Sequence, residues 1–362
     1  MRKPFVIAVL IAIACTSTAR AAHPTYRYEL VVEPPKSLEE VLRQRLAYGY
    51  ACAAVARPVG INLAINAAVV VGLEVGADVP LKRDVRVITV TPDDVDQLAR
   101  RLDASAAQGF GLCGLTITAP TGGRPDGDYL LVAVLTRTGD TPTGVTYRAI
   151  HDSGRRGEWA QLQQSAAAGF TVTGLVSRPQ LNVSSTSDMV AVAEKTAASR
   201  PIIYAQVLGG NSVGLKKDLD KSTARGYCVL TTWTTIDWMV VLLAKPIDAP
   251  CEDQHDYHLE ESSAFMGFSV SSSDGVLLGV HRVKDATIGL YDRTDGSFEY
   301  TVEGGVLIDT YFKPSEPREH RDLLVKLNAD GGRGYQPVDV AWRDAGREGS
   351  RAVDVVMGRA RN

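Results

Sequence analysis

The sequence of 362 residues lacks an excess of either charge, since 39 lysines and arginines stand against 42 aspartates and glutamates, for a formal net charge of −3. This near balance excludes a general nucleic-acid binder, which carries a strong basic excess. With 33 glycines and 17 prolines the chain is not a collagen, and a hydrophobic fraction of 45% excludes a disordered one. The composition is that of a globular protein.

The sequence has few of the short motifs of common catalytic sites. It contains no His-Glu-x-x-His, the pattern Gly-x-Ser-x-Gly occurs once, at residues 210–214, and only one pair of its six histidines is close in sequence. The glycine-rich segment 209–214 precedes an expected helix, where backbone amides can hold an anion, but it lacks the Gly-Lys-Ser/Thr ending of a P-loop. We interpret it as a connector in which Ser212 caps the helix.

Residues 1–21 are interpreted as a signal peptide. Two basic residues precede an apolar run over residues 5–14, and Ala19 and Ala21 are small residues of the kind that a signal peptidase reads. Cleavage near Ala21 removes three basic residues and no acid, which takes the net charge from −3 to −6. Lipid attachment at Cys15, as in a bacterial lipoprotein, is an alternative, although Ala12 stands where the lipoprotein cleavage box usually has leucine. We therefore expect a periplasmic or secreted protein.

The chain has no long hydrophobic run after this leader, so no membrane span is expected in the mature protein. Export makes Cys52, Cys113, Cys228 and Cys251 candidates for disulfides. Four cysteines allow three complete pairings, and the sequence does not choose among them. Four buried thiols remain an alternative.

One short pattern recurs along the chain: a small residue, any residue, a glycine and then an aromatic. The glycines lie at intervals of 60, 60, 57 and 108 residues, and the last interval is close to two periods. We therefore expect six repeated units, of which one has lost the pattern. The corner glycines are Gly49, Gly109, Gly169, Gly226 and Gly334, and the corner aromatics are Tyr50, Phe110, Phe170, Tyr227 and Tyr335.

Leucines precede each corner glycine at helical spacing. One stands seven residues before every corner glycine, and another stands eleven residues before it except in the third copy, where Glu158 takes that place. These spacings put the leucines on one stripe of an α-helix, and the glycine then lies just past the helix, where a left-handed residue turns the chain. We therefore assign the corner glycines a structural role. Helix starts are predicted at Ser37, which forms a capping box with Glu40, and at Thr91, which precedes Pro92.

Strands are expected before the helix, directly after the corner and again after a turn. Each unit then buries the apolar stripe of its helix on a three-stranded, mainly antiparallel sheet. The predicted fold class is α+β, built of tandem βαββ repeats. The predicted units span residues 24–77, 84–138, 144–196, 200–246, 251–303 and 304–362.

The fifth predicted unit is degenerate and rich in strands. Glu260 stands seven residues before Gly267, where the other copies have leucine. Short strands are predicted over 268–271, 276–282, 286–292 and 298–302, with Asp-Gly turns at 274–275 and 295–296. Function is expected where a repeat departs from its own pattern.

The repeated unit resembles a small bacterial βαββ domain family of unknown function. The resemblance rests on the tyrosine-rich opening at 26–32, on Leu38 and Leu42, and on the corner Gly49-Tyr50. The family most often has Glu-Gly-Trp at this corner, whereas every copy here has tyrosine or phenylalanine and no preceding glutamate. The resemblance implies a fold and brings no established activity or catalytic residues.

The paired histidines lie in the degenerate unit. Cys251, His255 and His258 fall within eight residues that also contain three carboxylates, and thiolates and imidazoles are ligands that zinc prefers. Their spacing is not that of a structural zinc site. The alternative interpretation is a polar linker with Cys251 in a disulfide.

These observations predict an exported repeat protein of the bacterial envelope that binds a protein, peptide or polysaccharide without catalysing a reaction and without a cofactor. A first alternative is a metal-dependent enzyme or metal-binding protein that uses Cys251, His255 and His258. A second is a purely structural or inhibitor protein. The corner aromatics could form a row of rings on which a glycan or peptide stacks. Packing of each aromatic beneath its own helix is the favoured interpretation, because every copy needs it.

Overall fold

The computed structural model describes residues 24–58, 66–76, 83–119, 129–137, 139, 144–152, 158–179, 187–235, 237–251, 255–262, 275–283, 286–293, 298–307, 317–344 and 351–361. The predicted signal peptide and Cys15 lie outside these residues. Among the helices of the described part, none is long and apolar enough to cross a membrane.

The fold is mixed α+β, and six antiparallel three-stranded sheets follow one another along the chain. In each sheet the last strand in sequence lies in the middle and pairs with the other two. The outer strands are β1 (Thr25–Glu33), β5 (Asp84–Val90), β8 (Thr146–Asp152), β11 (Ile202–Gly209), β14 (Tyr257–Ser262) and β17 (Phe298–Leu307). The central strands are β4 (Ala67–Val75), β7 (Leu130–Arg137), β10 (Ser187–Lys195), β13 (Met239–Pro246), β16 (Ala286–Asp292) and β19 (Arg351–Ala360). The inner strands are β2 (Ala51–Val55), β6 (Gly111–Thr118), β9 (Thr171–Pro179), β12 (Cys228–Thr234), β15 (Val276–Val283) and β18 (Gln336–Asp344).

We number the six sheets 1 to 6 in chain order. In five of them a described helix connects the outer strand to the inner strand. The described helices are α1 (Pro35–Ala47), α2 (Val95–Ala106), α3 (Glu158–Ala167), α4 (Ser212–Thr223) and α5 (Pro317–Gly331), and a short 3-10 turn, η1 (Pro92–Asp94), leads into α2. In sheet 5 the connection between β14 and β15, including the predicted corner at Gly267 and the predicted strand 268–271, lies outside the described residues.

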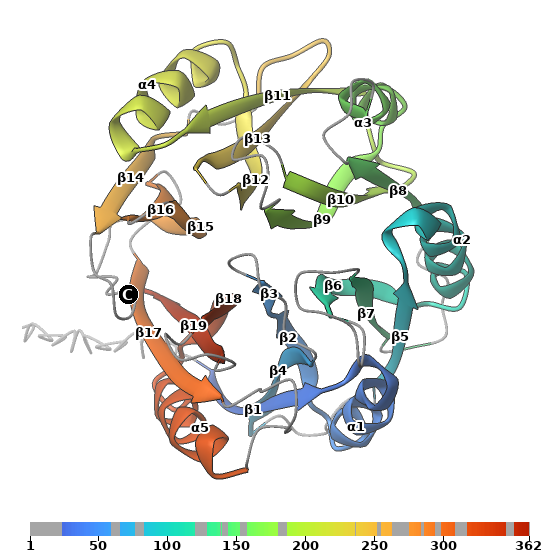
Figure 1. Ribbon diagram of the computed structural model, residues 1–362, viewed down its shortest axis with the longest axis vertical. Helices are drawn as coiled ribbons and strands as arrows, with labels where there is room; N and C mark the ends of the chain where they lie inside the picture. The colour runs from blue at the N-terminus through green and yellow to red at the C-terminus, as the bar shows by residue number, and fades with distance from the viewer. Residues whose placement is uncertain are drawn as a thin grey trace, which may run out of the picture.

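The six sheets form a ring with the helices on the outside and the inner strands toward the middle (Figure 1). Each helix packs on the outer strand of the following sheet: α1 on β5, α2 on β8, α3 on β11 and α4 on β14. The last helix, α5, packs on β1 in the same way, so sheet 6 joins sheet 1 and the ring is closed. A short strand, β3 (Arg57–Pro58), pairs in parallel with β18 across this closing junction.

The leucine stripe predicted from the sequence is buried, and it is shared between neighbouring sheets. Leu38 and Leu42 have no exposed surface and pack with Val85, which belongs to the outer strand of sheet 2. Leu215 and Leu219 likewise pack with strands of both sheets 4 and 5. Complete burial of one leucine contributes roughly 1.5–3 kcal/mol, so much of the free energy of each core depends on contact with the next sheet.

Polar side chains on the helices bind the backbone of the outer strand that they cover. The Asn328 side chain accepts a hydrogen bond from Tyr28 N–H at 2.8 Å and donates one to the Tyr28 carbonyl at 3.0 Å. Gln163 makes the same pair of bonds with Tyr204, at 3.2 and 2.7 Å. These bonds satisfy backbone groups at the free edge of the sheet, which otherwise invites pairing with another chain. Single bonds of this kind join Asp103 to Tyr147 N–H at 2.6 Å and Glu39 to Val87 N–H at 2.8 Å.

Sheet 5 follows the other sheets despite its divergent sequence. All six inner strands carry a bulge near their start, and in sheet 5 it lies between Leu277 and Gly279. The Tyr300 hydroxyl donates to the Gly275 carbonyl at 2.8 Å and accepts from Leu277 N–H at 2.6 Å. The Tyr204 hydroxyl makes the equivalent bond to the carbonyl of Phe170, the corner aromatic of sheet 3. Gly275 therefore occupies in sheet 5 the position that the corner aromatic occupies in sheet 3.

Three local predictions differ from the structure. The strand predicted at 298–302 in the fifth unit is the first half of β17 and pairs with β19, so sheet 6 begins before residue 304. The alternation of Phe298, Tyr300 and Val302 simply continues across that boundary. Helix α1 begins at Pro35, and Ser37 lies inside it, where its hydroxyl donates to Glu33 at 2.9 Å. Thr91 precedes a 3-10 turn and makes no side-chain bond to a backbone amide there.

Candidate functional site

The four cysteines of the described chain form two disulfides, Cys52–Cys113 and Cys228–Cys251. The first joins β2 of sheet 1 to β6 of sheet 2. The second joins the start of β12 to the segment that leads into sheet 5. Of the three pairings that the sequence left open, the structure therefore selects this one. Disulfides persist in oxidising compartments, which indicates a protein that functions outside the cytoplasm.

His255 lies beside the second disulfide. Its Nε2 is 4.0 Å from Cys251 Sγ, and its Nδ1 makes a close hydrogen bond with Asp292 Oδ2. Asp292, the last residue of β16, is 3% exposed, and the imidazole stacks on the Tyr257 ring with centroids 5.5 Å apart. The disulfide, the imidazole and a buried carboxylate thus form one row.

His258 is not part of this row. It lies one residue beyond Tyr257 in β14, and adjacent residues of a strand face opposite sides of the sheet. Its Nε2 lies 3.7 Å from Glu260 Oε1. In the described part of the chain, the ligand atoms that converge within 4.8 Å of one another belong to Cys228, Cys251 and His255. The structure therefore brings two of the three predicted ligands together and puts Cys228 beside them.

The corner glycines have φ angles of 93°, 85°, 87°, 82° and 85° at Gly49, Gly109, Gly169, Gly226 and Gly334, in the left-handed region. The corner aromatics that follow are buried, between 2% and 8% exposed. Cations lie over the rings of four of them, Phe110, Phe170, Tyr227 and Tyr335. At Phe110, Arg86 and Arg137 lie 4.5 and 4.7 Å from the ring centroid, and Arg137 also donates to the Gln108 carbonyl at the helix end, at 3.2 Å. The corner aromatics are therefore buried packing residues, and the cations over these four rings disfavour a stacking surface for a ligand.

The glycine-rich segment 209–214 binds the Glu261 carboxylate of the neighbouring strand β14. The Asn211 side chain caps α4 by accepting from Gly214 N–H at 2.8 Å, in place of the predicted cap Ser212. Ser212 N–H donates to Glu261 Oε2 of β14 at 2.9 Å. This contact lowers the pKa of Glu261. The amides at the helix start therefore join sheets 4 and 5.

A second polar cluster, which the sequence did not reveal, lies among the inner strands. The Arg57 guanidinium donates to both carboxylate oxygens of Asp339, at 3.1 and 2.6 Å, and to the Val280 carbonyl. It also donates to His281 Nδ1 at 3.1 Å, so Nε2 carries the proton and donates to Thr232 Oγ1 at 2.6 Å. We call these five residues the central cluster, since they join strands of sheets 4, 5 and 6 to β3, near the middle of the ring (Figure 1).

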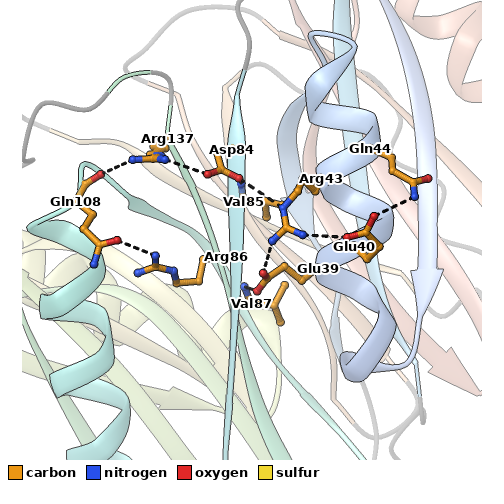
Figure 2. Close-up of polar contacts among 10 residues, drawn as sticks. All are labelled: Glu39, Glu40, Arg43, Gln44, Asp84, Val85, Arg86, Val87, Gln108 and Arg137. Atoms are coloured by element: carbon orange, nitrogen blue, oxygen red, sulfur yellow. Dashed lines mark hydrogen bonds and ion pairs between the residues drawn. The ribbon is translucent and has the colours of Figure 1, made fainter.

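A third polar network lies at the junction of sheets 1 and 2 (Figure 2). Arg43 pairs with Glu39 at 2.5 Å and Glu40 at 2.9 Å, and lies 3.8 Å from Asp84. Asp84 also pairs with Arg137 at 3.1 Å. Because the Arg43 side chain is 47% exposed, this network is largely solvated and contributes little to stability.

Comparison with protein-family models, with curated proteins and with solved structures finds no match. The geometry of the structure itself is therefore the evidence for function.

The central cluster predicts a loss of stability in acid. Burial, with a further contribution from the Arg57 charge, lowers the pKa of His281 well below its ordinary value of 6.5. The unfolded chain therefore binds a proton at a higher pH than the folded chain does. We expect the free energy of unfolding to be highest above pH 6.5 and to fall progressively as the pH decreases below it. Urea unfolding across this pH range measures the effect, and a His281→Gln variant whose stability fell just as steeply would show that another group is responsible.

Proposed function

We propose that the chain is an exported, non-catalytic binding protein of the bacterial envelope. In this proposal residues 1–21 are a signal peptide, the mature protein is periplasmic or secreted, and its six sheets are tandem βαββ units of the family that the sequence resembles. The recurrence of one strand order and one bulge in all six sheets supports the repeat.

The observation that carries the binding role is how the ring closes. The Asn328–Tyr28 bonds between the last and first sheets are of the same kind as the Gln163–Tyr204 bonds between sheets 3 and 4. The central cluster and the polar network at the sheet 1–sheet 2 junction likewise link one sheet to another. Repeat proteins of this kind offer a broad, rigid surface to a protein, peptide or polysaccharide partner.

Photo-crosslinking in the producing cell tests this role. A photoreactive amino acid is placed at Val213, which is 79% exposed, or at Val325, which is 63% exposed. We expect covalent adducts with an envelope component, and we expect those adducts to disappear in Gly331→Ala, in which a Cβ overlaps the Tyr26 carbonyl oxygen of β1 and opens the ring. Turnover by the purified protein in a screen of hydrolytic and redox substrates would contradict the proposal.

A second candidate function is metal binding at Cys228, Cys251 and His255. The convergence of these ligand atoms favours it, and the Asp292–His255 contact resembles the carboxylate that commonly orients a zinc-bound histidine. The test is elemental analysis of reduced protein, purified without a histidine tag and supplied with zinc. Bound zinc that is lost in His255→Phe and kept in His258→Phe supports this function, whereas no bound zinc in the reduced protein rejects it.

A further inference from the structure

We propose that Cys228–Cys251 is a disulfide that exchanges with external thiols, with His255 as the proton donor to its departing sulfur. This inference does not depend on the proposed binding role. It follows from three neighbouring groups: a disulfide between β12 and the segment that leads into sheet 5, an imidazole nitrogen beside one of its sulfurs, and a buried carboxylate behind that imidazole.

The contacts assign a role to each group. His255 Nε2 lies 4.0 Å from Cys251 Sγ, so an imidazolium there neutralises a thiolate as it forms on Cys251. Asp292 holds the other nitrogen, Nδ1, and thereby fixes the ring orientation that directs Nε2 toward the sulfur. Asp292 acts through His255 and is a positioning residue. The Tyr257 ring supports the imidazole from one face.

The reaction is ordinary thiol–disulfide exchange with a dithiol as reductant. A thiolate of the dithiol attacks Cys228 Sγ, the sulfur–sulfur bond breaks, and Cys251 leaves with the electron pair and receives a proton from His255. The second thiol of the reagent then attacks the mixed disulfide and releases Cys228 as a thiolate. One protein disulfide and one dithiol become one protein dithiol and one reagent disulfide, and a reagent proton restores the imidazolium.

The ring does not depend on this bond alone at the junction of sheets 4 and 5. Cys251 N–H donates to the Gly226 carbonyl at 2.9 Å, and Val229 N–H donates to the Tyr257 hydroxyl at 2.8 Å. The apolar cluster around Leu215 and Leu219 also spans both sheets. Reduction of the disulfide therefore leaves these contacts in place, and exchange can occur in the folded protein.

The other disulfide provides an internal control. Cys52 and Cys113 pack against an aliphatic cluster that contains Leu42, Val69 and Val71. In the described part of the chain, a convergence of histidine, cysteine and carboxylate ligand atoms occurs only at Cys228, Cys251 and His255. The difference in rate between the two disulfides of one molecule therefore measures the effect of the surroundings of Cys251.

The experiment treats the full folded protein with dithiothreitol, alkylates the free thiols at intervals and quantifies each cysteine peptide by mass spectrometry. We expect Cys228–Cys251 to be reduced at least about tenfold faster than Cys52–Cys113, as for a step assisted by a general acid. His255→Phe keeps an aromatic ring against Tyr257 but removes both nitrogens, and we expect it to abolish most of this difference. Equal rates for the two disulfides in the unchanged protein would overturn the proposal.

Two further variants separate proton donation from a structural effect. His258→Phe changes the other histidine of the same segment, and we expect no change in either rate. Asp292→Asn keeps a hydrogen-bonding side chain behind His255 and is expected to give an intermediate rate. If His255→Phe fails to fold, the comparison of Asp292→Asn with the unchanged protein carries the test, and identical reduction rates in the two would reject the proposal.

The Cys52–Cys113 disulfide of the same molecule gives a readout that a merely structural effect would also move. A variant that only loosened the fold would change the reduction rate at both disulfides, whereas loss of the proton donor slows the reduction of Cys228–Cys251 alone. A His255→Phe protein in which both rates change together would overturn the role of His255.

Discussion

Replacing Arg57 with methionine is expected to lower the free energy of unfolding by about 3 kcal/mol, because removal of one partner leaves the other charge buried and unpaired. The Asp339 side chain is only 16% exposed, and it loses both hydrogen bonds from the guanidinium. His281 Nδ1 and the Val280 carbonyl lose their donor in the same substitution. Urea unfolding of the purified variant measures the loss.

The control for this prediction is Arg43→Met, which removes an arginine with ion pairs to Glu39 and Glu40 on the surface (Figure 2). We expect that variant to lose less than about 1 kcal/mol, as is usual for exposed ion pairs. The double variant Arg57→Met/Asp339→Leu should be more stable than the sum of the two single losses predicts, by about 2 kcal/mol, because no unpaired charge remains. Additive losses would show that the pair is not coupled.

Gly331→Ala is expected to open the ring. A Cβ on Gly331 meets the Tyr26 carbonyl oxygen in direct overlap and lies 2.8 Å from Cε2 of Tyr28, so α5 and β1 must move apart. Overpacking of this kind costs about 3 kcal/mol, although alanine is the better helix former. Urea unfolding gives the loss of stability, and an increased sedimentation frictional ratio reports the opened ring.

The adjacent Gly332→Ala provides a matched control. A Cβ there has as its nearest contacts the carbonyl oxygens of Asn328 and Ala329, at 3.4 and 3.5 Å. We expect its stability to stay within about 0.5 kcal/mol of the unchanged protein and its sedimentation to be the same. A Gly331→Ala protein as stable and as compact as Gly332→Ala would show that the α5–β1 contact is not needed for closure.

Much of the architecture could be predicted from short-range pattern. The leucine spacing identified the buried stripe, and a strand was expected before and after each helix, as the structure shows. Such features depend on residues a few positions apart, which one helix or one strand brings together. The hydrogen bonds from helix side chains to the backbone of the next outer strand were not predicted, although the sequence carried a signal. Their donors and acceptors Asp103, Gln163 and Asn328 each stand six residues before a corner glycine.

The central cluster could not be predicted in the same way, because Arg57, His281 and Asp339 come from three parts of the chain that meet only in the closed ring. A weak signal existed at Asp339, which stands four residues after its corner aromatic, where two of the other sheets have Gly114 and Gly174. His258 was misplaced for a related reason. Proximity in sequence suggested a shared site, but the alternation of β14 separates it from the face that Tyr257 and His255 share.

The closing contact between α5 and β1 has a consequence for how the protein is made. The Asn328–Tyr28 bond spans 300 residues of chain, whereas the Gln163–Tyr204 bond spans 41. Loop-closure entropy alone makes the long connection about 2 kcal/mol more costly. The edge of β1 therefore stays uncovered until nearly the whole chain has been synthesised. A nascent chain thus carries an exposed strand edge until α5 is complete, and this edge is where a chaperone has most reason to bind.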